Sequence, residues 1–186
     1  MTAQFGPSAL ATPANLLTVA RLVLTVPFLA MVIDGGASWT ALGLWILLCA
    51  TDAVDGQLAR RHGTTRSGAF LDPLADKVLV LGALAALVSS DLVPALPVVL
   101  IAVRELGVQA LRSWWGKRGL AIPATGLAKA KTFAQEIAVG FALCPLTHER
   151  TALVEGMLWI AVALTLVSGV QYVQAGSRLT TAAGSR

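Results

Sequence analysis

Apolar residues gather in six long runs that short polar stretches separate. The runs are Leu16–Ile33, Trp39–Ala53, Leu74–Val88, Leu92–Leu111, Thr132–Leu146 and Thr151–Val173. None shows the strict alternation of a half-buried strand. Several runs reach the roughly 20 residues of a membrane-crossing helix only if polar residues at one end are included. Only helices or closed barrels satisfy their backbone groups in lipid, so the pattern predicts an all-α fold, a polytopic membrane bundle of about six transmembrane helices.

The composition supports this interpretation. Of the 186 residues, 56% are hydrophobic and only 13% are charged, and the mean hydropathy is +0.74. A soluble globular domain carries about 25% charged residues. The sequence therefore predicts an integral membrane protein, embedded in a lipid bilayer, and no nucleic-acid partner is expected.

The basic residues are distributed unevenly between the two sides of the predicted bundle. Of the 14 Lys and Arg residues, only Arg150 falls in the short connections DGGAS, SSDLVP and THER. The other connections hold most of the positive charge that flanks the helices. The positive-inside rule then places both termini in the cytosol of a multi-pass protein of the cell membrane.

Four aspartates stand at the edge of the second and third apolar runs: Asp52, Asp55, Asp72 and Asp76. The first two are three residues apart and the last two are four apart, so each pair shares one face of a helix. One pair ends a predicted helix and the other begins the next. A short link makes these helices antiparallel neighbours, so the four carboxylates are expected to converge near the cytosolic side.

Burying these acids in lipid without partners is costly, about 2.5–3.5 kcal/mol each at mid-membrane. They must therefore be wet, paired or bound to metal. Carboxylates suit hard cations such as Mg²⁺ or Mn²⁺. Four of them are enough for two ions, which can clamp a phosphoryl group during displacement. A set of solvated helix ends is the simpler alternative.

Small residues and one arginine accompany the aspartates. Gly56, Ala59 and Gly68 allow close packing and leave room for a nucleotide near the backbone. Arg60 is suited to gripping phosphate. These residues favour a site for a phosphorylated ligand beside the predicted metal site.

A second basic set occurs near the cytosolic ends of the fourth and fifth helices. It consists of Arg104, Arg112, Lys129 and Lys131. Positive-inside bias explains Arg104 poorly, because it lies between two apolar stretches. We interpret the set as a pocket for a phosphate-bearing acceptor. A structural role for Arg104, in which it pairs with Glu105 or Asp72, is the alternative.

The aspartate segment resembles the signature of the CDP-alcohol phosphotransferases. It reads DxxDGxxAR over residues 52–60 and GxxxDxxxD over residues 68–76. PANLLTVARLVLTVP, FLDPLADKVLV, VRELGVQALR and AKAKTFAQ resemble the branch of that family that makes phosphatidylglycerophosphate. Two departures are visible. Seven residues separate Arg60 from Gly68, one fewer than expected, and Ala128 stands where that branch often has Gly.

The resemblance implies a fold, a reaction and residue roles. The fold is a six-helix membrane enzyme, usually a homodimer, whose site faces the cytosol. The enzyme transfers the phosphatidyl group of CDP-diacylglycerol to an alcohol and releases CMP. Asp52, Asp55 and Asp72 would be the principal metal ligands, and Asp76 would assist them and act as general base.

Further roles concern the nucleotide. Gly56, Ala59 and Arg60 would line the CDP pocket, with Gly68 of the same signature beside it. The resemblance also implies that Asn15, Thr18 and Arg21 face that cavity. For Arg21 the alternative is a side chain that snorkels to the membrane surface. The chain would divide into a lead at 1–12, a single transmembrane catalytic domain at 13–176 and a tail at 177–186.

The acceptor and the class of protein have competitors at this stage. The second basic set favours a phosphorylated acceptor, and the resemblance favours glycerol 3-phosphate. Inositol phosphate, or phosphatidylglycerol in cardiolipin synthesis, remains an alternative with the same chemistry. An intramembrane prenyltransferase normally has two aspartate-rich motifs, and a cation transporter would not need Arg60. Both are more distant alternatives.

Overall fold

The computed structural model describes residues 13–62, 68–117 and 126–184, without the side chains of 13–15, 52–62, 68–73, 117, 128 and 179–184. These ranges form six helices and contain no strand. The helices are α1 (Pro13–Gly35), α2 (Trp39–His62), α3 (Gly68–Ser89), α4 (Ala95–Lys117), α5 (Gly126–Leu143) and α6 (Thr151–Gly184). The prediction of an all-α protein with six helices is confirmed.

Some boundaries differ from the apolar runs. α2 continues through the aspartate segment to His62, and α3 begins at Gly68, before its two aspartates. α6 extends to Gly184, so most of the segment that we set apart as a tail is helical. The reason is that polar residues at a helix end prolong the helix without prolonging the apolar run. The predicted N-terminal lead at 1–12 lies outside the described residues.

Local signals explain the sharp turn between α1 and α2. Gly36 has a φ of 65°, and its N–H donates to the carbonyl of Val32 at 2.9 Å. A left-handed residue after a helix commonly closes the last turn in this way, and glycine adopts it without strain. Ser38 then caps α2, because its Oγ accepts from the N–H of Ala41 at 3.2 Å. The chain therefore reverses direction within a few residues.

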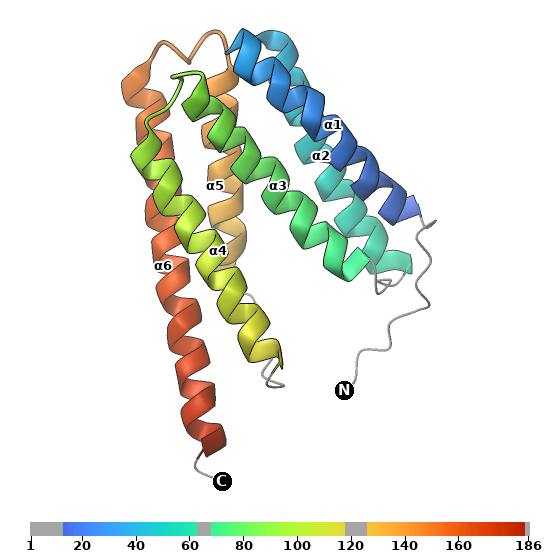
Figure 1. Cartoon of the computed structure of the whole chain (residues 1–186), viewed down its shortest axis with the longest axis vertical. Coiled ribbons are helices and arrows are strands. Elements are labelled where there is room, and N and C mark those ends of the chain that lie inside the picture. The colour runs from blue at the N-terminus through green and yellow to red at the C-terminus, as the bar shows by residue number, and fades with distance from the viewer. Residues whose placement is uncertain (1–12, 63–67, 118–125, 185–186) are drawn as a thin grey trace.

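The helices form two groups of three (Figure 1). α1 packs against α2 and α3, and α6 packs against α4 and α5. The groups meet where α3 contacts α4 and α5, and where α2 contacts α5. The connections α1–α2, α3–α4 and α5–α6 lie at one end of the bundle, and the end of α2 and the start of α3 lie toward the other (Figure 1).

Trp45 is a central packing residue between the two groups. Its ring stacks on Phe28 of α1 with centroids 5.6 Å apart, and both side chains are buried. Its Nε1–H donates to the backbone carbonyl of Glu136 in α5 at 3.1 Å. One α2 side chain thus joins α1 to α5, and its polar atom is satisfied, as burial requires.

The outer surface of the bundle is apolar. Large hydrophobic side chains are exposed on several helices, among them Val26 of α1, Val103 of α4 and Val170 of α6. The segments Leu16–Gly35 and Thr151–Arg178 are long and apolar enough to cross a bilayer, by length and composition. A soluble monomer seldom exposes many large apolar side chains on several helices in this way. These features are those of a membrane protein.

Candidate active site

The four aspartates lie on the two helices that the sequence predicted. Asp52 and Asp55 are in the last turns of α2, and Asp72 and Asp76 are in the first turns of α3. The helical conformation places the members of each pair on one face. Of the four, only Asp76 has a described side chain, so the convergence of the carboxylates stays a prediction. The side chains of Ala59 and Arg60, and the surroundings of Gly56 and Gly68, lie outside the described set as well.

Asp76 borders a small polar cavity between three helices. The cavity has a volume of about 10 Å³, and Lys77, Glu105, Lys131 and Gln135 also line it. That volume is close to the minimum that holds one water molecule. The structure therefore brings the predicted general base and Lys131, a predicted acceptor residue, to the walls of one cavity.

Arg21 is buried beside the start of the aspartate segment. Its side chain is 1% exposed, and its Nε–H donates to Thr51 Oγ1 at 3.5 Å. Thr51 immediately precedes Asp52 in α2. The guanidinium thus points into the bundle toward α2 and does not snorkel to the surface. Thr18, one turn earlier on the same face of α1, is also buried, whereas the side chain of Asn15 is not described.

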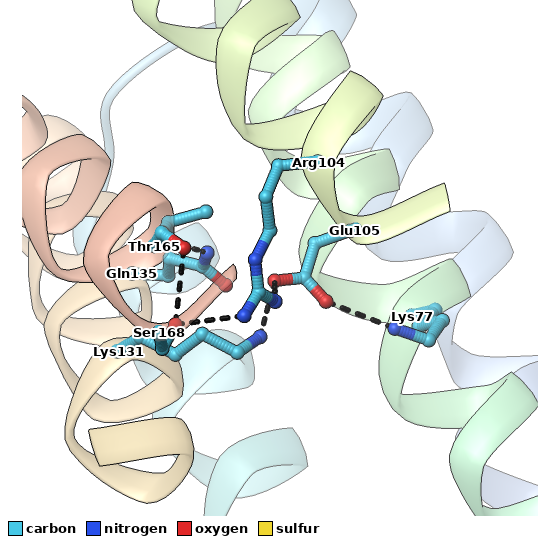
Figure 2. Close-up of polar contacts among 7 residues, drawn as sticks. All are labelled: Lys77, Arg104, Glu105, Lys131, Gln135, Thr165 and Ser168. Carbon is cyan, nitrogen blue, oxygen red and sulfur yellow. Dashed lines mark hydrogen bonds and ion pairs between the residues drawn. The ribbon is translucent and has the colours of Figure 1, made fainter. Parts of the chain in front are cut away.

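Glu105 of α4 is the centre of a charged cluster (Figure 2). Its Oε1 accepts from Arg104 Nη1 at 2.8 Å and also from Lys131 Nζ of α5. Its Oε2 accepts from Lys77 Nζ of α3 at 2.9 Å. The sequence suggested Glu105 or Asp72 as a partner of Arg104, and the structure shows the pair with Glu105. The three side chains of Arg104, Glu105 and Lys131 are at most 10% exposed, so this ion-pair network is largely shielded from water.

Polar groups of α6 extend the cluster on its far side. Arg104 Nη2 donates to Ser168 Oγ at 2.7 Å, and Ser168 Oγ donates to the carbonyl of Thr165 at 3.0 Å. Gln135 Nε2 of α5 donates to Thr165 Oγ1 at 2.9 Å (Figure 2). Sequence reasoning missed Lys77, Gln135 and these two α6 residues. The available signal was the position of Lys77 next to Asp76, and the i, i+3 spacing of two hydroxyls inside an apolar run.

The other two members of the predicted acceptor set lie apart from this cluster. Arg112 is eight residues further along α4, about 12 Å by helical rise. Its guanidinium carbon lies 5.4 Å from the ring centre of Tyr172 in α6, a cation–π distance. Lys129 is exposed in the first turn of α5. The structure thus brings Arg104 and Lys131 together around Glu105, and it does not place Arg112 or Lys129 in that contact set.

An apolar pocket lies between α2 and α5. It has a volume of about 380 Å³, and its walls include Leu42, Ile46 and Cys49 of α2 and Phe133 and Gly140 of α5. Cys49 stands less than one helical turn before Asp52. The pocket therefore extends along α2 from the neighbourhood of the aspartate segment toward the opposite end of the bundle, and its lining suits a hydrocarbon chain.

Comparisons with known proteins identify the family of this chain. A family model described as CDP-alcohol phosphatidyltransferase matches residues 11–167. The chain is 40% identical over 174 residues to a Mycobacterium tuberculosis protein named "Probable phosphatidylglycerophosphate synthase", covering 90% of this chain and 83% of that one. It is 44% identical over 133 residues, 69% of each chain, to a Bacillus subtilis protein named CDP-diacylglycerol–glycerol-3-phosphate 3-phosphatidyltransferase. A Rickettsia felis protein of that name is 34% identical over 171 residues, covering 87% and 93% of the two chains. The aspartate signature, the helical fold and these matches together show that the chain belongs to the CDP-alcohol phosphatidyltransferase family.

Proposed function

We propose that this enzyme transfers the phosphatidyl group of CDP-diacylglycerol to glycerol 3-phosphate, forming phosphatidylglycerophosphate and CMP. The observation that carries the proposal is the cavity shared by Asp76 and the Glu105 cluster. The carboxylate of Asp76, which can take a hydroxyl proton, lines this cavity together with Lys131. Glu105, also in its wall, is bonded to Arg104. The chemistry of these groups, rather than the volume of the cavity, matches an acceptor with a hydroxyl at one end and a phosphate at the other, and binding would require the cavity to widen.

In the reaction, a hydroxyl oxygen of the acceptor bonds to the phosphorus that carries the diacylglycerol. The bond between that phosphorus and the bridging oxygen breaks, and CMP leaves with the electron pair. Asp76 takes the proton of this hydroxyl. A general base must lie within hydrogen-bond reach of the proton that it takes, so the hydroxyl is proposed to bind next to Asp76. Arg104 and Lys131 hold the phosphate of the acceptor through charge-assisted hydrogen bonds. Arg112 and Lys129 belong to the same proposed set as outlying cations.

Asp52, Asp55, Asp72 and Asp76 are proposed to hold two Mg²⁺ or Mn²⁺ ions. An all-carboxylate donor set at the end of α2 and the start of α3 fits the preference of these ions for oxygen. When bound, the metal offsets the negative charge of the diphosphate. Gly56, Ala59, Arg60, Gly68, Asn15, Thr18 and Arg21 are proposed to line the CDP pocket. The buried position of Arg21 beside Thr51 supports this, because a buried guanidinium needs anionic or polar partners.

The donor lipid has a place for its hydrocarbon part. The pocket between α2 and α5 runs along the helix that carries Asp52 and Asp55, and its walls are almost wholly apolar. We propose that one acyl chain of CDP-diacylglycerol lies there while its diphosphate reaches the aspartate segment. The alternating direction of the helices in Figure 1 supports a further proposal. All six helices cross the cell membrane. Both termini and the active site face the cytosol, as the distribution of basic residues favours, and the family resemblance favours a homodimer.

The test is an acceptor panel. Purified enzyme receives CDP-diacylglycerol with glycerol 3-phosphate, inositol phosphate or phosphatidylglycerol, and both CMP and the lipid product are identified. We expect phosphatidylglycerophosphate as the dominant product, formed roughly tenfold or more faster than the products of the other acceptors. A preference for inositol phosphate or phosphatidylglycerol would reject the acceptor and leave the family chemistry in place. Family membership already sets aside the prenyltransferase and transporter alternatives.

A further inference from the structure

We propose that Lys77 and Glu105 form a positioning pair that fixes the distance between the base Asp76 and the acceptor-binding cations Arg104 and Lys131. The inference rests on the proposed function and adds two residues to it. Neither is proposed to touch the reacting atoms. Their role is to hold the end of the site that binds phosphate in register with the end that takes the proton.

The contacts of Glu105 show how one carboxylate can set this register. Its Oε2 holds Lys77 Nζ at 2.9 Å, and its Oε1 holds both Arg104 and Lys131. Lys77 follows Asp76 directly on α3, and both residues line the same cavity. Glu105 therefore ties the helix of the base to the two helices that carry the cations (Figure 2).

These contacts also lie where the two helix groups meet. α3 belongs to the first group, whereas α4 and α5 belong to the second. The Lys77–Glu105 ion pair crosses this boundary beside Asp76. The side chain of Lys77 is 22% exposed and that of Glu105 is 8% exposed, so water screens the pair only in part. A change in this link shifts the base relative to the cations without removing either.

The charges of the cluster point to an anion as the ligand that it positions. Lys77, Arg104 and Lys131 carry three positive charges around the single negative charge of Glu105. Arg104 and Lys131 share one oxygen, so Glu105 holds together two cations that repel one another. The four groups together have a net charge of +2 in their ionised forms, and the carboxylate of Asp76 on the same cavity lowers the local sum to +1, so the site still attracts an anion.

The chemistry makes the register important for rate. Once its phosphate is held by Arg104 and Lys131, a small acceptor has few ways to bring its hydroxyl to Asp76. A misplacement of about 1 Å can cost on the order of 100-fold in rate. Breaking the Lys77 link is therefore expected to lower kcat, whereas removing the charge of Glu105 also loosens the cations and weakens acceptor binding.

The experiment compares steady-state kinetics of Lys77→Met, Lys77→Arg and Glu105→Gln with those of the wild type, with both substrates varied. For Lys77→Met we expect kcat to fall about 10- to 100-fold while the KM for glycerol 3-phosphate changes less than about threefold. Lys77→Arg keeps the ion pair and should recover most of kcat. Glu105→Gln should raise that KM by about tenfold or more. The KM for CDP-diacylglycerol should stay near wild type in all three.

A matched control is Arg178→Met, which removes one exposed cation of α6 and should leave both constants unchanged. The inference is overturned if Lys77→Met keeps a normal kcat, or if Lys77→Arg is no better than Lys77→Met. Equal changes in both KM values would also overturn it, because they indicate a general structural defect. If Lys77→Met is not recovered folded, Lys77→Ala, which also removes the ammonium group and the link to Glu105, takes its place with the same criteria. If the wild type prefers another phosphorylated acceptor, the proposed function fails, and the same kcat-against-KM comparison with that acceptor still tests the positioning pair.

Discussion

Gly169 of α6 offers a way to displace Arg104 without altering any charged residue. Arg104 packs directly on this glycine. A Cβ added at Gly169 would stand 2.9 Å from Arg104 Nε and 3.2 Å from Arg104 Cγ. Ordinary contacts of a Cβ begin at 3.4 Å, so Gly169→Ala forces the arginine to move by about 0.5 Å.

The movement has an electrostatic cost because Arg104 is held at both ends of its guanidinium. Nη1 donates to Glu105 at 2.8 Å and Nη2 donates to Ser168 at 2.7 Å. A hydrogen bond to a charged group contributes about 1.5–3 kcal/mol. Partial loss of this geometry should cost about 1–2 kcal/mol of acceptor binding. That corresponds to a rise of roughly 5- to 30-fold in the KM for glycerol 3-phosphate.

The assay measures CMP release at saturating CDP-diacylglycerol, and two other α6 glycines are the controls. A Cβ at Gly156 would meet nothing within 4 Å. Gly156→Ala should leave both KM values unchanged and stabilise the helix by up to about 1 kcal/mol. A Cβ at Gly176 would stand 2.0 Å from Trp115 Cη2, so Gly176→Ala should lower Tm. An acceptor KM for Gly169→Ala equal to that of Gly156→Ala would refute the reasoning, as would an equal rise in the donor KM.

Three further predictions concern the proposed base, the metal and the donor pocket. Asp76→Asn should lower kcat by about 10²- to 10⁴-fold, because an amide cannot take the hydroxyl proton, and should leave the donor KM within a few-fold of wild type. A normal kcat would exclude Asp76 as the base. A chelator should abolish CMP release and added Mg²⁺ or Mn²⁺ should restore it, so full turnover in metal-free buffer would contradict the role of the aspartates as ligands. Arg21→Met keeps an apolar stem but loses the buried charge, and should raise the donor KM about 10- to 150-fold with the acceptor KM unchanged. A rise in the acceptor KM alone would show that Arg21 binds the acceptor instead of the donor.

The helices could be predicted from the sequence because the apolar runs are long and the turns between them carry strong local signals. Gly36 and Ser38 close one helix and open the next through contacts with near neighbours in the chain. The placement of both aspartate pairs on helices follows from the same reasoning, since spacings of three and four residues are meaningful only on a helix. The length of α6 could not be predicted, because its last turns lie beyond its apolar run.

The Glu105 cluster could be predicted only in part. Sequence reasoning identified Arg104 and Lys131 as unusual and named Glu105 as one partner of Arg104. It did not identify Lys77, because a lysine beside an aspartate at a helix start is explained equally well by solvent exposure. The Lys77–Glu105 and Lys131–Glu105 contacts join residues 28 and 26 positions apart, and their formation depends on how α3, α4 and α5 pack. No local pattern in one sequence specifies that packing.

The two helix groups carry different parts of the proposed active site. The residues proposed for the donor, the aspartates with Arg21 and Arg60, lie on α1, α2 and α3. The cations proposed for the acceptor lie on α4 and α5, and Ser168 of α6 supports one of them. The diphosphate headgroup of the donor and the acceptor would then be held by different groups and would react where these groups meet. Ion pairs at that boundary affect the relative position of the substrates more directly than they affect binding of either one. For this reason a kcat effect at Lys77 that is independent of KM would be evidence about the whole bundle as well as about one residue.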